Sequence, residues 1–135
     1  MILHPYFVFN GQAREALLFY CEALDISHGE IKAYGDSPMP HTPEQKNWVV
    51  HAELQFDGET IAMFADSAET PLAKNSNIHI SLNYDDLALM EKSFAQLAEG
   101  GKIDMPLEMQ FWNATFGTLT DKFGIHWMMN FDHTS

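Results

Sequence analysis

His51 and Glu53 lie two residues apart in a segment that alternates between apolar and polar side chains. In a β-strand, side chains two residues apart lie on the same face, about 6–7 Å from one another. A histidine and a carboxylate at this spacing can act as a general base and its orienting partner. The same pair is also typical of a polar contact on a solvated strand face. The spacing therefore leaves a functional and a structural interpretation open.

His79 lies on the polar side of a second alternating segment, opposite three aliphatic side chains. Because an imidazole titrates near neutral pH, His79 is a candidate ligand, acid or base. A histidine that is hydrogen-bonded within a half-buried strand fits the pattern as well. His51, Glu53 and His79 together also have the donor types of a metal site in a non-standard arrangement.

Large apolar side chains near the C-terminal end form a third candidate group. One interpretation is an apolar pocket for a small organic ligand, because such pockets are mostly hydrophobic with few polar groups. The residues of this group are Trp112, Phe116, Trp127 and Met128. Aromatic residues on strands are also common in protein cores. Both interpretations stay open, because a curved sheet fills its concave side either with side chains or with a ligand.

Hydrophobic periodicity indicates the elements that position these side chains. Apolar residues at three- and four-residue steps predict two helices, the second capped by Asp85 or Asp86. Asp57-Gly58 is a strong hairpin signal, and a Pro-rich loop covers 35–47. The expected elements are, in order, a strand at 3–10, a helix at 13–24, a short strand at 30–34, strands at 48–56 and 60–65, a strand at 77–83, a helix at 87–97, and strands at 102–111, 114–120 and 125–131.

This order is strand, helix, three strands, and then the same again, with the two halves offset by roughly 75 residues. Residue identity between the halves is low, so the repeat lies in the element order and the apolar period. The sequence therefore predicts an α+β fold, one domain over 1–135, made of two βαβββ modules at about 1–66 and 77–135.

The composition excludes several classes of function. The 135 residues include 7 basic and 19 acidic side chains, for a net charge of −12. This balance disfavours nucleic-acid binding, which depends on clustered Lys and Arg. No apolar run approaches the roughly 20 residues of a membrane span, and no basic-then-apolar leader begins the chain. A single cysteine fits a reducing compartment, so we expect a cytoplasmic protein that binds neither nucleic acid nor membrane. Anionic ligands are disfavoured unless a basic side chain lines the site, the candidates being Arg14, Lys32, Lys46, Lys74 and Lys102.

Several segments, in this order and spacing, resemble a known family. They are Pro5–Gly11, Glu15–Tyr20, His51–Leu54, Phe111–Trp112 and, above all, Phe116–Gly124 followed by Trp127–Asn130. Together with the two βαβββ units they resemble the PhnB-like branch of the vicinal-oxygen-chelate superfamily, which includes glyoxalase I, extradiol dioxygenases and bleomycin-resistance proteins. The resemblance implies curved mixed sheets that form a cup, with the helices packed outside, and a homodimer.

The superfamily's enzymes hold a divalent metal through a ligand from the first and last strand of each unit. In the first unit, the matching positions are Pro5 on the first strand and a last strand, at 61–65, that contains no ligand residue. In the second unit, they are His79 on the first strand and Met128 on the last, with His126 on the same face as Met128. The resemblance therefore implies no cofactor, His79 being the weak candidate for a divalent metal.

The expected function is binding of a small organic molecule near His51, Glu53, His79, Trp112, Phe116 and Met128, with any reaction left open. The alternatives are a metal-dependent lyase, isomerase or dioxygenase with an altered ligand set, and a drug-sequestering resistance protein. The branch carries a label for methyl transfer in ubiquinone synthesis. The sequence has no Gly-rich strand-to-helix turn that cradles a nucleotide-like cofactor.

Overall fold

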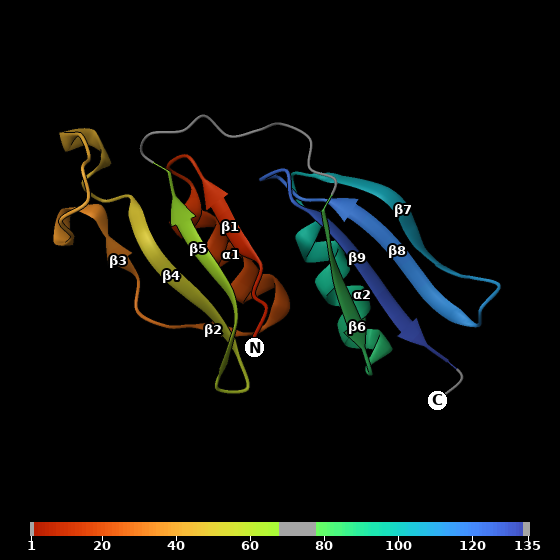
Figure 1. The fold of residues 1–135 in the computed structure, drawn as a ribbon. Helices are drawn as coiled ribbons and strands as arrows, with labels where there is room; N and C mark the ends of the chain where they lie inside the picture. Colours follow the sequence, from red (N-terminus) through yellow and green to blue (C-terminus); the bar gives the residue numbers. More distant parts are fainter. Residues whose placement is uncertain (1, 68–77, 134–135) are drawn as a thin grey trace. The chain divides into compact units, whose positions relative to one another are not determined.

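A computed structural model describes residues 2–67 and 78–133 of the chain. The chain divides into two compact units, Met1–Ala73 and Lys74–Ser135, which are described separately. In each unit, one helix lies against one face of a β-sheet (Figure 1). Lys74, a candidate basic residue, and position 77, where the strand expected at 77–83 begins, lie outside the described residues.

The first unit contains a five-stranded sheet. Its order is β1-β5-β4-β2, and β3 also pairs with β4. The pair β1–β5 is parallel, and the other pairs are antiparallel. Its elements are β1 (Tyr6–Phe9), α1 (Ala13–Leu24), β2 (Ser27–His28), β3 (Lys32–Ala33), the short 3-10 helices η1 (Tyr34–Asp36) and η2 (Pro43–Gln45), β4 (Val49–Phe56) and β5 (Glu59–Asp66).

The core of the first unit lies between α1 and the sheet. Leu17 and Tyr20, from the apolar face of α1, are fully buried. The ring of Phe64 on β5 lies 5.7 Å from that of Tyr20 and 4.9 Å from that of Phe7. Three- and four-residue steps place one apolar stripe on the helix, and the strands supply every second residue, so the predicted periods bring these side chains together.

Two local predictions in the first unit need correction. The single strand expected at 30–34 is replaced by β2 and β3, two short strands that both pair with β4. Alternation along β4 after the buried Ala52 and Leu54 would place Phe56 on the core side as well, but Phe56 is 60% exposed. The cause is a register shift between Leu54 and Gln55, which breaks the alternation before the strand ends. The hairpin at Asp57-Gly58 is confirmed, with positive φ at both residues.

The second unit contains a four-stranded sheet in the order β6-β9-β8-β7. The pair β6–β9 is parallel and the other two pairs are antiparallel. Asp86 caps α2, because its Oδ1 accepts a hydrogen bond from the backbone N–H of Leu89 at 3.1 Å. The elements are β6 (His79–Tyr84), α2 (Leu87–Leu97), β7 (Lys102–Met109), β8 (Ala114–Thr120) and β9 (His126–Asp132).

The two sheets have the same topology. In each unit the first strand pairs in parallel with the last strand. On its other side, the last strand pairs with the strand that precedes it in sequence, and the strand after the helix lies at the far edge. The predicted α+β class and the two βαβββ units are therefore confirmed, with β2 and β3 together filling the place of one strand. Within the described residues, no helix has the length and apolar character needed to cross a membrane.

Candidate functional site

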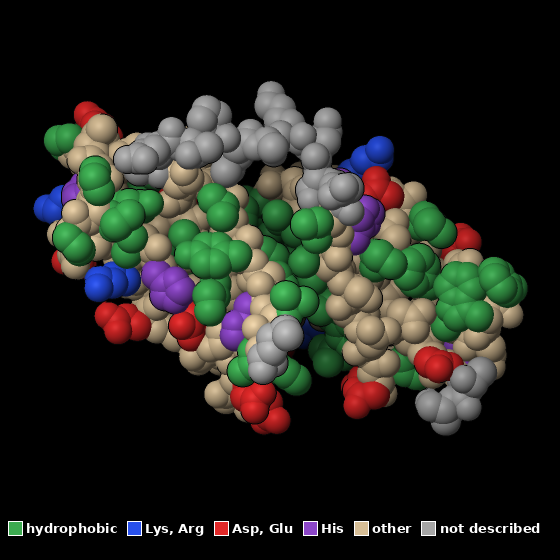
Figure 2. Space-filling model, in the orientation of Figure 1, with side chains coloured by type: hydrophobic (Ala, Val, Ile, Leu, Met, Phe, Trp, Pro, Cys, Tyr) green, Lys and Arg blue, Asp and Glu red, His purple; other side chains and the backbone are tan. Residues whose placement is uncertain are grey.

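The first unit has a sheet face that α1 does not cover, here called the first helix-free face. Because side chains alternate along a strand, Phe7, Ala52 and Phe64 face the helix. The first helix-free face carries the residues between them: Tyr6, Val8, His51, Glu53, Thr60 and Met63. Figure 2 shows histidine and charged side chains beside a hydrophobic patch over this part of the molecule.

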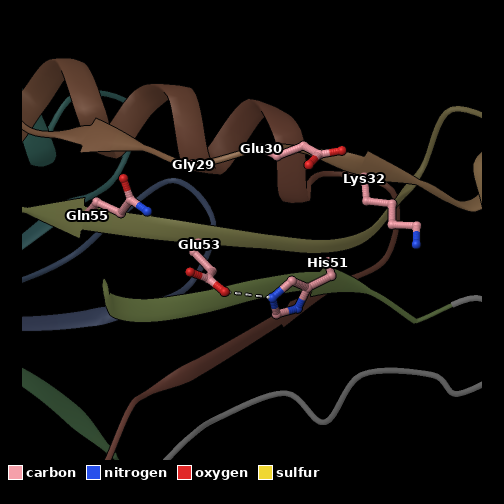
Figure 3. A pocket seen from close by; sticks show the side chains of 6 residues that line it. All are labelled: Gly29, Glu30, Lys32, His51, Glu53 and Gln55. Carbon is pink, nitrogen blue, oxygen red and sulfur yellow. Dashed lines mark hydrogen bonds and ion pairs between the residues drawn. The ribbon is translucent and has the colours of Figure 1, made fainter. Parts of the chain in front are cut away.

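His51 and Glu53 are in contact on this face. Nε2 of His51 lies 3.2 Å from Oε2 of Glu53, and the hydroxyl of Thr60 donates a hydrogen bond to Oε1 at 2.6 Å. The ring of Tyr6 lies 6.5 Å from the His51 ring. In Figure 3 the side chains of His51 and Glu53 point toward one another along β4. The predicted pairing on one strand face is thus present, with Thr60 as a partner that the sequence did not reveal.

The electrostatics of this pair determine what His51 offers to a ligand. The hydrogen bond from Thr60 lowers the pKa of Glu53, and the hydrogen bond from His51 lowers it further. An ionised carboxylate only accepts hydrogen bonds, so Nε2 of His51 is the donor. In the neutral ring, Nδ1 then carries the lone pair, and no residue within 2–67 or 78–133 bonds to it.

A pocket of about 250 Å³ opens beside this pair. Lys32 lies opposite His51 in the β3–β4 register, which brings one positive charge to the site. Gly29 allows the Gln55 side chain to approach, since a Cβ at position 29 would lie 3.0 Å from its Nε2. The pocket is lined by Gly29, Glu30, Lys32, His51, Glu53 and Gln55 (Figure 3). Of these residues, the sequence analysis named His51, Glu53 and Lys32. Gly29 and Glu30 were missed because they lie between β2 and β3, which are too short for a periodic signal.

The second unit has a corresponding uncovered face, here called the second helix-free face. It carries His79, Phe116, Thr120, His126, Met128 and Asn130. His79 lies beside His126, with the two rings stacked at a centroid distance of 5.0 Å. Trp112 lies next to Phe116, with ring centroids 5.7 Å apart. That these residues share one cup with His51 and Glu53 concerns the placement of the two units and stays a prediction.

Trp127 was expected as a possible pocket residue and belongs to the core instead. It is 2% exposed, and its Nε1 donates a hydrogen bond to Oδ2 of Asp121 at 2.8 Å. Trp127 is adjacent to Met128, so the alternation of β9 sends the two side chains to opposite faces. Met128 therefore remains on the second helix-free face while Trp127 packs on the side of α2.

Among the described residues, neither unit by itself groups enough donor side chains for a protein-held metal. Within residues 2–67 and 78–133, no three His, Cys, Asp or Glu side chains are close enough to hold an ion. The second unit brings His79 and His126 together, and the first brings His51 and Glu53 together. A protein site ordinarily needs three or four converging donors, so we derive no step through a metal.

The helix N-termini also do not fit the phosphates of a nucleotide-like cofactor. In the first unit, Oδ1 of the buried Asp66 accepts hydrogen bonds from the N–H groups of Gly11 and Ala13 at 2.8 and 2.9 Å. In the second unit, Asp86 occupies the N-terminus of α2. Because carboxylates already fill these positions, the groups that ordinarily bind a phosphate are taken.

Comparison with known proteins first defines the class. A glyoxylase/bleomycin resistance protein/dioxygenase domain from Frankia sp. EAN1pec has the same fold, with a TM-score of 0.72, 11% identity, and coverage of 100% of this chain and 93% of that one. The chain thus has the fold of the vicinal-oxygen-chelate superfamily. A model of the 3-demethylubiquinone-9 3-methyltransferase family matches residues 2–130, and the chain belongs to this PhnB-like family.

Individual relatives cover nearly the whole chain. Protein YjdN from Escherichia coli K12 is 30% identical over 140 residues, which span 96% of this chain and 95% of that protein. Protein PA1353 from Pseudomonas aeruginosa is 38% identical, with 98% of each chain covered and a TM-score of 0.88. A putative 3-demethylubiquinone-9 3-methyltransferase, PhnB protein, from Bacillus cereus is 26% identical, with 97% and 99% covered and a TM-score of 0.82. The resemblance to the PhnB-like branch is confirmed.

Proposed function

We propose that the chain binds a small organic molecule at the His51–Glu53 pocket of the first unit. The observation that carries the proposal is the hydrogen bond between His51 and Glu53, with Thr60 anchoring the carboxylate. This arrangement leaves Nδ1 of His51 as a fixed acceptor at the wall of the pocket. A ligand with a hydroxyl or N–H donor is the chemistry that such an acceptor selects.

The surroundings support a ligand that is only partly polar. Tyr6 and Val8 are 51% and 42% exposed on the first helix-free face, next to the polar pair. Met63 lies opposite Glu53 and Tyr6 in the register of the sheet. An apolar part of the ligand would cover these side chains, while its polar end reaches His51. Binding sites for small molecules combine apolar walls with a few placed polar groups in this way.

The same pair is suited to proton transfer if a reaction follows binding. An imidazole whose far nitrogen is held by an ionised carboxylate has the arrangement of a general base and its orienting partner. His51 would accept a proton at Nδ1 from the bound ligand, and Glu53 would stabilise the resulting positive charge. Binding without reaction, as in sequestration, uses the same contacts. We therefore place ligand binding first.

The test is identification of the compounds that copurify with the full chain, by mass spectrometry of denatured protein. We expect one compound in wild type, and a loss of about ten-fold or more in His51→Ala and Glu53→Gln, since each removes a charge-assisted hydrogen bond. Glu22→Gln is the matched control, because Glu22 is exposed on α1, on the opposite side of the sheet. Equal recovery from all four proteins would contradict the proposal.

A metal analysis separates this proposal from the metal-dependent alternative. Protein purified without chelators is compared with His79→Ala and Glu53→Ala. Stoichiometric metal in wild type that is lost in both variants would favour a metal-dependent enzyme and overturn the proposed binding mode. We expect low metal content that is the same in wild type and in both variants. We also expect the copurifying compound to be lost in Glu53→Ala and retained in His79→Ala.

A further inference from the structure

Two turns of the first unit contain a glycine that follows an asparagine or an aspartate. Asn10-Gly11 joins β1 to α1, with a φ of 96° at Gly11. Asp57-Gly58 joins β4 to β5, with φ values of 53° and 80°. All four residues are exposed. Exposure therefore does not distinguish the two turns, but their hydrogen bonds do.

These dipeptides share a reaction that needs no other molecule to begin. The backbone nitrogen of the glycine can attack the side-chain carbon Cγ of the preceding residue and close a five-membered imide ring. Intramolecular attack is fast only when the backbone can bring the two atoms into line, and glycine resists that rotation least. A turn that holds the glycine N–H is thus protected, and a turn that leaves it free can react.

The Asn10-Gly11 turn is held at three points. The N–H of Gly11 donates a hydrogen bond to Oδ1 of Asp66 at 2.8 Å, and Nδ2 of Asn10 donates one to the backbone oxygen of Ser67 at 3.1 Å. The indole of Trp48 covers the glycine, since a Cβ at Gly11 would lie 2.9 Å from its Cζ2. The turn must therefore break a charge-assisted hydrogen bond before its nitrogen can attack.

Among the residues that the structure describes, nothing restrains the Asp57-Gly58 turn in this way. Neither the Asp57 carboxylate nor the N–H of Gly58 has a hydrogen-bond partner within 2–67 and 78–133. Apart from its chain neighbours, a Cβ at Gly58 would have no atom within 4 Å. The turn projects beyond the end of the strands (Figure 1). It can therefore rotate into the reactive geometry without breaking a hydrogen bond of its own.

We propose that Asp57 is a site of spontaneous covalent modification, where the native protein converts aspartate to isoaspartate while Asn10 stays intact. The nitrogen of Gly58 bonds to Cγ of Asp57, the bond from Cγ to its hydroxyl oxygen breaks, and this hydroxyl leaves as water with the N–H proton. Water then opens the imide at the former backbone carbonyl, so that the chain runs through Cβ and Cγ. One water is released and one is consumed, with no oxidant or reductant.

The modification acts on the candidate site through the β4–β5 pairing. Isoaspartate adds one carbon to the backbone next to the pairs Phe56–Glu59 and Gln55–Thr60, which a register shift separates from the rest of the ladder. Thr60 lies on the turn side of that shift, and Glu53, to which it donates a hydrogen bond at 2.6 Å, lies on the other side. We expect the shift to accommodate the longer turn, which moves Thr60 away from Glu53. This inference holds whether or not the pocket binds a ligand.

The test is incubation of the full chain in H₂¹⁸O at neutral pH for several weeks. Tryptic cleavage at Arg14 and Lys46 puts the two dipeptides on separate peptides, and electron-transfer fragmentation distinguishes isoaspartate from aspartate. In the native chain we expect ¹⁸O-labelled isoaspartate at Asp57 and an unchanged Asn10. In the chain unfolded in guanidinium we expect Asn10 to react first, because an amide loses ammonia more readily than an ionised carboxylate loses oxygen.

Asp57→Asn is the matched variant, because the chain then contains Asn-Gly at both turns and only the structure differs. We expect position 57 of the native variant to lose its amide at least about ten-fold faster than Asn10, and at a similar rate after unfolding. Asp57→Glu is the blocked control, since its ring would need six members, and it should accumulate no product. Equal rates at the two positions of native Asp57→Asn, or isoaspartate confined to unfolded wild type, would overturn the proposal.

A second measurement follows Glu53 in the isomerised protein. The Thr60 hydrogen bond is the main cause of the lowered pKa of Glu53, so carboxyl-detected NMR should give a higher pKa in the purified isomerised fraction than in fresh protein. Incubated Asp57→Glu should keep the pKa of its fresh sample. An unchanged pKa of Glu53 in the isomerised fraction would overturn the displacement of Thr60.

Discussion

The two units share one strand order but hold a histidine on the helix-free face in opposite ways. In the first unit, Nε2 of His51 bonds directly to Glu53, and Thr60 fixes that carboxylate from its other side. In the second unit, Thr120 stands between the ring and the carboxylate of Asp104, because its Oγ1 lies 2.9 Å from Nδ1 of His126 and 2.8 Å from Oδ2 of Asp104. The order of threonine and carboxylate is thus exchanged between the units.

The exchange decides which nitrogen each face presents as an acceptor. His51 presents Nδ1. His126 presents Nε2, because the Thr120 hydroxyl donates to the carboxylate and can then only accept from Nδ1. The two histidines are not at equivalent positions either, since His51 lies on β4 and His126 on β9, whose counterpart in the first unit is β5. The duplicated backbone therefore repeats the faces, while the side chains on each face build a separate hydrogen-bond network.

The units also anchor their helices differently, and this contrast gives the largest expected effect. Asp66 reaches α1 from the end of β5, and its Oδ2 accepts a third hydrogen bond, from the N–H of Val49 at 2.9 Å. In Asp66→Asn, an amide group would face the N–H of Val49, donor against donor. We expect a loss of about 3 kcal/mol in the free energy of unfolding, measured by urea denaturation.

Asp57→Asn is the control for Asp66→Asn, because Asp57 is exposed in a turn with positive φ, which asparagine also adopts. We expect its free energy of unfolding to stay within about 0.5 kcal/mol of wild type. A similar small effect for Asp66→Asn would show that Asp66 does not anchor α1.

Two glycines, Gly101 in the second unit and Gly29 in the first, give the next contrast. A Cβ at Gly101 of the second unit would lie 2.3 Å from the backbone oxygen of Thr120, whereas one at Gly29 of the first unit meets only the end of the Gln55 side chain. We expect Gly101→Ala to lower the free energy of unfolding by about 2 kcal/mol or more. Gly29→Ala should cost less than half as much, and the reverse order would contradict the geometry.

Removal of the local cap gives a smaller effect. Asp86 caps α2 with its own side chain, while Gln12 at the corresponding position of α1 makes no side-chain cap. We expect Asp86→Ala to lower the free energy of unfolding by about 1 kcal/mol. Gln12→Ala should leave it nearly unchanged in the same denaturation experiment. Equal losses in both variants would remove the distinction between the two helix anchors.

The smallest effect concerns the titration of Glu53. The hydrogen bond from Thr60 is the main cause of its lowered pKa, so Thr60→Val should raise that pKa toward its ordinary value, and by more than His51→Gln does. Because the folded-state pKa is the lower one, the stabilisation is present above the ordinary pKa of a glutamate and is lost as the pH falls through the folded value. Carboxyl-detected NMR titration measures the shift, with Thr118→Val in the second unit as the control. An unchanged pKa in Thr60→Val would contradict the assigned cause.

Much of the fold follows from patterns that the sequence carries locally. The apolar steps in α1 and α2 and the alternation in β4 gave elements within a few residues of those observed, because burial on one face imposes the period directly. The pairing of His51 with Glu53 followed from the same alternation. The short strands β2 and β3 did not, since two residues are too few for a period.

The partners of the candidate site residues depend on strand register, which the sequence does not carry. Thr60 reaches Glu53 only through the β4–β5 pairing, and Asp104 reaches Thr120 across a register shift in β7. His79 meets His126 because β6 and β9 pair in parallel. Such contacts join segments far apart in the sequence, so the residue types alone left the interpretation of His79 open.

The parallel pairing of first and last strands has a consequence for how the protein is made. β1 has no partner until β5 exists, and β6 has none until β9 exists. Pairing of strands that are far apart in the sequence slows folding, because the entropic cost of closing the loop between them arises before the contacts between the strands form. During synthesis, the N-terminal unit has its full set of strands before the first strand of the other unit leaves the ribosome. We therefore expect it to fold first, with the C-terminal unit following only after β9 has been synthesised.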